Sequence, residues 1–122
     1  QIQAAVAAVH TDAATAGATD WAQILQLYDQ LLAVQPTAVT ALNRAVALAE
    51  VEGPGPALAE VDRLEGLDGY HHLHATRADL LRRLGRVDEA RSAYDAALAR
   101  AGNATERRFL EGRRADLGPD TR

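Results

Sequence analysis

The 122-residue sequence contains no cysteine and no methionine, and its positive charge comes from arginine alone, without lysine. Without cysteine, disulfides, thiolate zinc sites and thiol nucleophiles are excluded. Without an initiating methionine, we expect the chain to be a fragment of a longer protein. The sequence has no run of about 18 apolar residues and no visible secretory leader. We therefore expect a cytoplasmic protein with no membrane partner.

The charge is unevenly distributed along the chain, and aromatic residues are scarce at 4%. Residues 1–70 contain two arginines and nine acidic residues, which gives a net charge of −7. Residues 71–122 contain eleven arginines and eight acidic residues, which gives a net charge of +3. With a total of −4, the segment is a poor candidate for binding DNA or RNA by itself. An acidic half beside a basic half favours docking onto another protein surface.

Residues 71–104 carry the strongest local pattern, that of a tetratricopeptide-type (TPR) helical hairpin. In this pattern small residues stand where two antiparallel helices cross closely, a glycine stands at the turn and a large residue fills the gap between neighbours. The matching residues are Ala78, Leu81, Gly85, Ala90, Tyr94, Ala97 and Leu98. Because one hairpin cannot bury its apolar surface alone, further helices must stack on it. The pattern predicts a binding scaffold and not an enzyme.

Helical periodicity predicts one all-α domain over residues 1–122, with about seven helices stacked as antiparallel hairpins. The first covers residues 2–10. Asp20, Thr37 and Asn103 are the expected N-caps of the second, third and last helices, and Pro56 is the expected first residue of the fourth. The fifth and sixth run from about residue 70 to 84 and from about 87 to 101. The expected core side chains are Trp21, Tyr28, Leu42, Leu81, Tyr94, Leu98 and Phe109.

A second copy of the hairpin pattern emerges when Gly53 is aligned with Gly85. The spacing between these two glycines is close to the tetratricopeptide period of about 34 residues. Asp62 then takes the place of Tyr94, which predicts a degraded repeat. The sequence thus predicts a TPR-like solenoid in which 71–104 is the best repeat, two weaker copies flank it, and an arginine-rich last helix forms a polar cap.

Five blocks in fixed order carry a family resemblance that covers essentially the whole chain. They are residues 4–10 (AAVAAVH), 20–32 (DWAQILQLYDQLL), 41–47 (ALNRAVA), 69–86 (GYHHLHATRADLLRRLGR) and 103–110 (NATERRFL). The series resembles the C-terminal extension of bacterial extracytoplasmic-function (ECF) RNA polymerase sigma factors that carry a tetratricopeptide-like domain. In that family two sigma regions precede the extension: one binds core polymerase and opens the −10 element, and the other reads the −35 element.

Neither sigma region is present here, so the resemblance implies that DNA is contacted only through missing parts of the parent protein. It further implies a regulatory or protein-interaction role in transcription initiation. The expected partner is the RNA polymerase core, the parent's own sigma regions or a regulatory protein. The alternative is a stand-alone TPR adaptor that binds a peptide and has no tie to transcription. Sigma-type regions upstream of Gln1 in the parent gene would distinguish the two.

Mapping the chain onto the repeat predicts which side chains line the concave surface that such solenoids use to hold partners. The predicted partner-binding residues are Thr40, Asn43, Glu50, His72, Asp79 and Arg82. Asn43 and Arg82 are the preferred anchors, because an amide offers a donor and an acceptor and a guanidinium offers a planar fork. The alternative for Asn43 is an amide that satisfies a backbone carbonyl between helices.

The histidine cluster His71, His72 and His74 invites a metal hypothesis, since positions 71 and 74 share a helical face. No third and fourth ligand stands at suitable spacing, so a packed and hydrogen-bonded helix start is the favoured interpretation. Ser92, the only serine, has no adjacent histidine that could activate it. We expect no metal, no cofactor and no catalytic residue.

Overall fold

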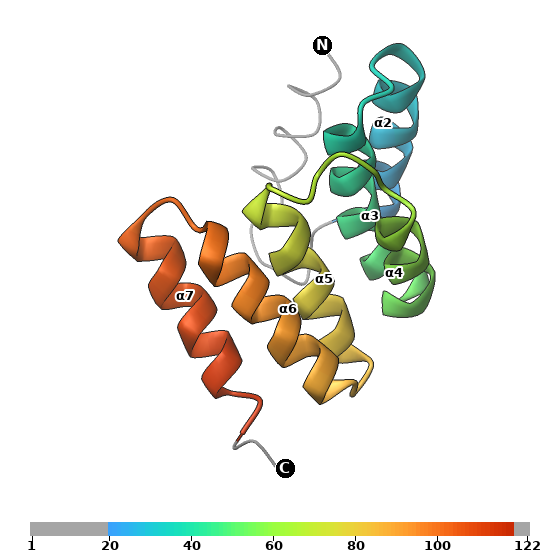
Figure 1. Ribbon diagram of the computed structural model, residues 1–122. Coiled ribbons are helices and arrows are strands. Elements are labelled where there is room, and N and C mark those ends of the chain that lie inside the picture. The colour runs from blue at the N-terminus through green and yellow to red at the C-terminus, as the bar shows by residue number, and fades with distance from the viewer. Residues whose placement is uncertain (1–19, 119–122) are drawn as a thin grey trace.

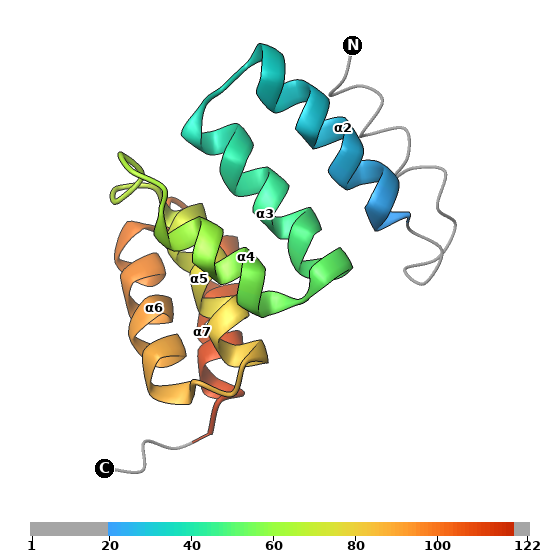
Figure 2. The same cartoon turned by 90° about the vertical axis from the view of Figure 1, so that its right-hand side faces the viewer.

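The computed structural model describes residues 20–118, and this part of the chain consists of six α-helices and no strand. The helices are α2 (Trp21–Val34), α3 (Ala38–Glu52), α4 (Pro54–Asp62), α5 (His71–Arg83), α6 (Val87–Arg100) and α7 (Ala104–Ala115). Each helix packs on the next one in the chain, and α5, α6 and α7 lie side by side (Figure 1). Figure 2 shows α2 and α3 as a neighbouring antiparallel pair. The all-α prediction is confirmed, and the expected helix over residues 2–10 lies outside the described residues.

Three helices begin at the predicted capping side chains. Asp20, Thr37 and Asn103 each accept a hydrogen bond from the backbone N–H three residues later, which satisfies one free donor of the first turn. The prediction for the fourth helix was wrong by two residues, because α4 begins at Pro54 and Gly53 is its N-cap. Proline fits this first position because the N–H that it lacks has no partner within the helix.

Helix starts recur at a constant interval in two interleaved series. Helices α2, α4 and α6 begin at Trp21, Pro54 and Val87, and helices α3, α5 and α7 begin at Ala38, His71 and Ala104. The interval is 33 positions, the same as the separation of Glu50 and Arg83 along the chain. We call the alignment of the chain at this interval the observed register.

The repeat interval predicted from the sequence, which is the spacing from Gly53 to Gly85, is one position shorter than the observed interval. The predicted register was therefore wrong. It aligned two turns of unequal length, because Gly53 alone separates α3 from α4 whereas residues 84–86 separate α5 from α6. In the observed register the counterpart of Tyr94 is Val61 and not Asp62. Both Val61 and Tyr94 are buried, so this position belongs to the core in both repeats.

The core follows the observed register. Ala45 and Ala78, Ala47 and Leu80, Leu48 and Leu81, and Ala57 and Ala90 are pairs of counterparts in which both members are buried. Small side chains at the first and last of these pairs let neighbouring helix backbones approach closely. Leu42, Leu81 and Tyr94 are buried as predicted, whereas Trp21, Tyr28 and Leu98 are partly buried.

Phe109 was the wrong core prediction, since 59% of its surface is exposed. Helix α7 buries only Leu110, and the α7 counterparts of the buried Ala78 and Leu81 are Glu111 and Arg114. Charged side chains at these positions make α7 more polar than α5, and its role as the polar cap of a solenoid stays a prediction.

Three aspartate–arginine pairs join successive helices, and their aspartates recur at the same interval as the helix starts. Asp29, Asp62 and Asp95 are counterparts in the observed register and pair with Arg44, Arg77 and Arg114 on the following helix, α3, α5 and α7 respectively. Each of these partly exposed pairs contributes about 0–1 kcal/mol, so apolar burial stabilises the fold and the pairs help to fix its register.

Candidate protein-interaction groove

A depression of about 250 Å³ lies between α3, α5 and α7. Its apolar lining comes from Val46, Ala49, Ala75, Leu80 and Phe109, and its polar lining comes from Glu50, His72, Thr76, Asp79 and Arg83. The lining residues of α5 recur three or four positions apart, which places them on one face of that helix. The depression is thus lined by both apolar and charged side chains.

A second depression of about 140 Å³ adjoins the first, between α2, α3 and the start of α5. Trp21, Ile24, Tyr28, Asn43, Val46, Ala47 and His72 line it. Val46 and His72 belong to both depressions, so the two form one continuous surface, which we call the inner groove. Aromatic side chains stand at both of its ends, Trp21 and Tyr28 on α2 and Phe109 on α7.

Four of the six predicted partner-binding residues line the inner groove: Asn43, Glu50, His72 and Asp79. Thr40 does not, because it is 4% exposed and its hydroxyl lies 2.9 Å from that of Thr37 at the start of α3. Thr40 was therefore predicted wrongly as a surface residue. Its burial follows from the observed register, in which its counterpart is the buried Leu73.

Arg82, a preferred anchor in the sequence analysis, lines neither depression. Its guanidinium donates to Asp79 Oδ1, and the hydrogen bond to Asp79 raises the pKa of Arg82. Its neighbour Arg83 reaches the groove instead. Arg83 was not among the predicted residues, because the alignment of Gly53 with Gly85 set Glu50 against Arg82. The observed register sets Glu50 against Arg83.

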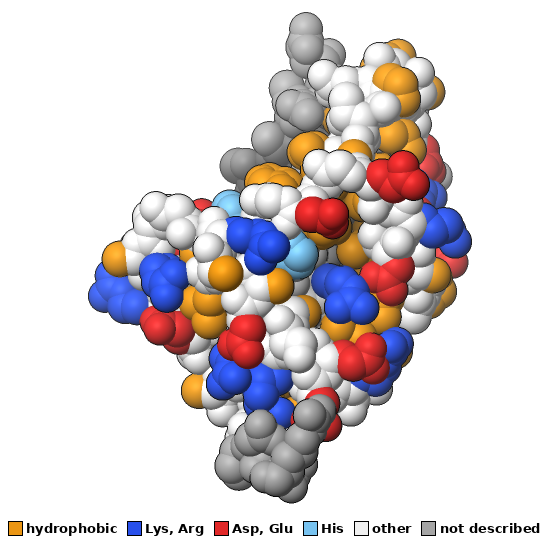
Figure 3. Space-filling model, in the orientation of Figure 1, with side chains coloured by type: hydrophobic (Ala, Val, Ile, Leu, Met, Phe, Trp, Pro, Cys, Tyr) orange, Lys and Arg blue, Asp and Glu red, His pale blue; other side chains and the backbone are white. Residues whose placement is uncertain are grey.

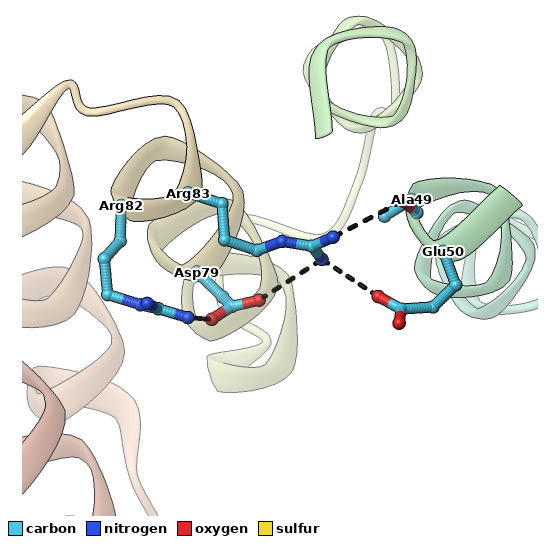
Figure 4. Close-up of polar contacts among 5 residues, drawn as sticks. All are labelled: Ala49, Glu50, Asp79, Arg82 and Arg83. Carbon is cyan, nitrogen blue, oxygen red and sulfur yellow. Dashed lines mark hydrogen bonds and ion pairs between the residues drawn. The ribbon is translucent and has the colours of Figure 1, made fainter. Parts of the chain in front are cut away.

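Arg83 spans the space between α5 and α3 (Figure 4). Its Nη1 donates to Glu50 Oε2 over 3.0 Å, and its Nη2 donates to the carbonyl oxygen of Ala49 over 3.4 Å. Asp79 stands between the two arginines, with one oxygen towards Arg82 and the other 3.9 Å from Arg83. Two carboxylates and two guanidiniums thus form a chain without net charge at this end of the groove.

The three histidines have different surroundings. His71 Nε2 lies 3.3 Å from Glu106 Oε1 on α7, and His74 Nε2 donates to the carbonyl oxygen of Asp68 over 2.7 Å. His72 lines the groove; burial and, to a lesser extent, the neighbouring His71 lower its pKa. Within residues 20–118 no three His, Asp or Glu side chains are arranged to hold a metal ion.

Phe109 forms the α7 side of the groove. Arg113 does not line the groove, but its guanidinium carbon lies 5.2 Å from the centre of the Phe109 ring. This distance is within the range of a cation–π contact. The apolar periodicity of residues in α7 led to the prediction that Phe109 lies in the core. The observed register would have corrected this prediction, because it aligns Phe109 with Asn43 and Thr76, which both line the groove.

The size of the groove differs from that of ordinary small-molecule sites. Its larger depression has a volume of about 250 Å³, below the roughly 300–1,000 Å³ of such sites. On the face shown in Figure 3, arginines and carboxylates are interspersed, so no continuous basic surface for nucleic acid covers this face. Among the helices that the structure describes, none is long and apolar enough to cross a membrane.

Comparison with known proteins shows a clear sequence similarity to a bacterial protein. The chain is 50% identical over 111 residues to a protein of Rhizobium meliloti (strain 1021) called "Uncharacterized protein R00370". The match covers 90% of this chain and 26% of that protein, so the chain spans about a quarter of the relative's length. No family model and no solved structure matches the chain.

Proposed function

We propose that this chain is a TPR-like protein-interaction domain that serves as the C-terminal extension of an ECF-family sigma factor. The inner groove is its working surface, and its role in transcription initiation is to hold the RNA polymerase core, the parent's sigma regions or a regulatory protein. The domain has no catalytic role and acts in the cytoplasm, where transcription takes place.

The constant interval between helix starts is the observation that carries this proposal. This interval is close to the tetratricopeptide period, and solenoids of this type use the surface formed by their first helices to hold partners. Helices α3, α5 and α7 are the first helices in the observed register, and all three contribute to the groove. The tie to transcription comes from the five sequence blocks, and the greater length of the relative leaves room for sigma regions outside the matched segment.

Run-off transcription with the full-length parent protein tests the proposal. Deletion of this domain should reduce transcription from a promoter that the parent serves. The double substitution Asn43→Ala and Phe109→Ala should do the same with little change in the melting temperature of the 122-residue chain, because neither side chain is fully buried. Arg63→Gln, an exposed position outside the groove, is the matched control.

The outcomes separate the two classes of function. Full transcription after deletion of the domain, or a start codon directly before Gln1 in the parent gene, would contradict the sigma-factor role and favour a stand-alone TPR adaptor. Full transcription with the double variant but not with the deletion would show that the groove is not the working surface. The arginine-rich face formed by residues 107–114 would then be the next surface to test.

A further inference from the structure

Phe109 is an exposed aromatic residue in a helix made mostly of polar residues. Helix α7 is polar and buries only Leu110, yet the large aromatic side chain of Phe109 is 59% exposed and lines the depression shared with α3 and α5. A side chain that only closed the stack would lie on the side of Leu110, which packs on the core. Phe109 instead extends the apolar surface of Val46 and Ala75. Partly exposed aromatic side chains beside an apolar depression are frequent anchors of protein interfaces.

Arg113, one turn after Phe109, adds a charge to this surface. Its guanidinium stacks on the Phe109 ring, and within residues 20–118 no carboxylate pairs with it. The counterparts of Arg113 in the observed register are Ala47 and Leu80, which are both buried and apolar. A charged side chain at this position is therefore not a feature of the other repeats. The hydrogen-bond donors of a guanidinium lie in its plane, so stacking of one face on a ring does not consume them, and they can still match the geometry of a carboxylate.

The other charges at this depression neutralise one another. Glu50 and Asp79 are paired with Arg83, and Asp79 also accepts from Arg82. A partner therefore gains little from placing a charge at the α3 end of the depression. At the α7 end, a carboxylate of the partner would meet Arg113, which stacks on an aromatic ring and has no ion pair within residues 20–118. Charge complementarity thus indicates an acidic occupant that approaches α7.

We propose that the depression between α3, α5 and α7 binds an acidic segment of a partner protein, which inserts one bulky apolar side chain beside Phe109 and places a carboxylate on Arg113. This inference rests on the proposed interaction role of the inner groove and specifies the chemistry of its partner. The volume of about 250 Å³ accommodates an insertion of this size.

Selection of random displayed peptides on the immobilised chain tests this inference without the parent protein. The chain should enrich peptides that combine a large apolar residue with nearby Asp or Glu. Arg113→Gln should remove the preference for acidic residues, and Phe109→Ala should remove the enrichment itself. Arg108→Gln is the matched control, since Arg108 is exposed on α7 and has no ion pair among the described residues. Thermal melts should show that all three variants remain folded.

An enriched peptide labelled with a fluorophore then gives the affinity. Arg113→Gln should weaken binding about tenfold, as expected for loss of one charge-assisted hydrogen bond, and Arg108→Gln should leave it unchanged. Enrichment of basic or uncharged peptides, no enrichment at all, or an equal effect of Arg108→Gln would overturn the inference. Acidic peptides bound through Arg113 without any effect of Phe109→Ala and Arg113→Gln on run-off transcription would uphold the binding chemistry and contradict the proposed role in transcription.

Discussion

Arg83 on α5 and Glu50 on α3 occupy the same position in successive repeats and pair with each other, with 3.0 Å between Nη1 and Oε2. The pair therefore joins one repeat to the next across the border of the inner groove. The carbonyl oxygen of Ala49 accepts a further hydrogen bond from the same guanidinium. The pair thus fixes the position of two side chains that line the groove.

The Arg83–Glu50 pair should contribute little to stability. Both side chains are about one-third exposed, at 29% and 36%, and solvent screens pairs of this kind. A double-mutant cycle with Arg83→Met and Glu50→Gln should give a coupling free energy of about 0.2–1 kcal/mol that shrinks as salt is added. A salt-independent coupling above about 2 kcal/mol, measured by urea denaturation, would show that the pair is a main stabilising contact.

Tyr94 should be among the most sensitive core positions. It is 2% exposed in the main core cluster, and removal of its ring leaves a cavity that the surrounding helices cannot fill. Tyr94→Ala should therefore lower the free energy of unfolding by about 3–5 kcal/mol. Tyr94→Phe keeps the ring and should cost only about 1 kcal/mol. Urea denaturation measures both, and an unchanged midpoint for Tyr94→Ala would contradict the position of this residue in the core.

Gly85 and Gly112 should respond in opposite directions to substitution by alanine. Gly85 has a φ of 78° at the α5–α6 turn, where an added Cβ meets no atom within 4 Å but disfavours the backbone conformation. Gly85→Ala should therefore cost about 1–2 kcal/mol. Gly112 lies inside α7, also with open space around its Cβ, so Gly112→Ala should add about 0.5–1 kcal/mol. Thermal melts that shift in the same direction for both variants would refute this contrast.

The sequence was sufficient to predict the elements that depend on local chemistry. Capping side chains such as Asp20 and Thr37 act on backbone groups three residues away, so their effect is visible in a short window. The turn glycine Gly85 and the small residues of the α5–α6 hairpin are local in the same sense. Most of the helix bounds and the central core residues were predicted from these signals.

The register of the repeat was harder to predict because it depends on turn lengths, which the conspicuous glycines obscured. Gly53 and Gly85 look equivalent but occupy different places in their turns, since the first is an N-cap and the second precedes one. The resulting shift by one position selected Arg82 in place of Arg83 and missed the burial of Thr40. Phe109 was misplaced for another reason: periodicity identifies an apolar face but does not say whether another helix covers it.

His72 should make the stability of the domain depend on pH. Burial lowers its pKa from the ordinary value of 6.5, and the neighbouring His71 lowers it further. As the pH falls, the unfolded chain therefore takes up a proton before the folded chain does, which favours unfolding. The contribution of His72 is complete above about pH 6.5 and is lost as the pH falls from there through the pKa of the folded state.

His72→Gln, which cannot take up a proton, should reduce the loss of unfolding free energy between about pH 7.5 and pH 5. His74→Gln is the matched control, because it removes a histidine that lines neither depression. The unfolding free energy of this variant should depend on pH as that of the wild type does. Urea denaturation of the three proteins at each pH supplies the comparison. If His72→Gln lost as much stability on acidification as the wild type, protonation of His72 would not be the cause of the pH dependence.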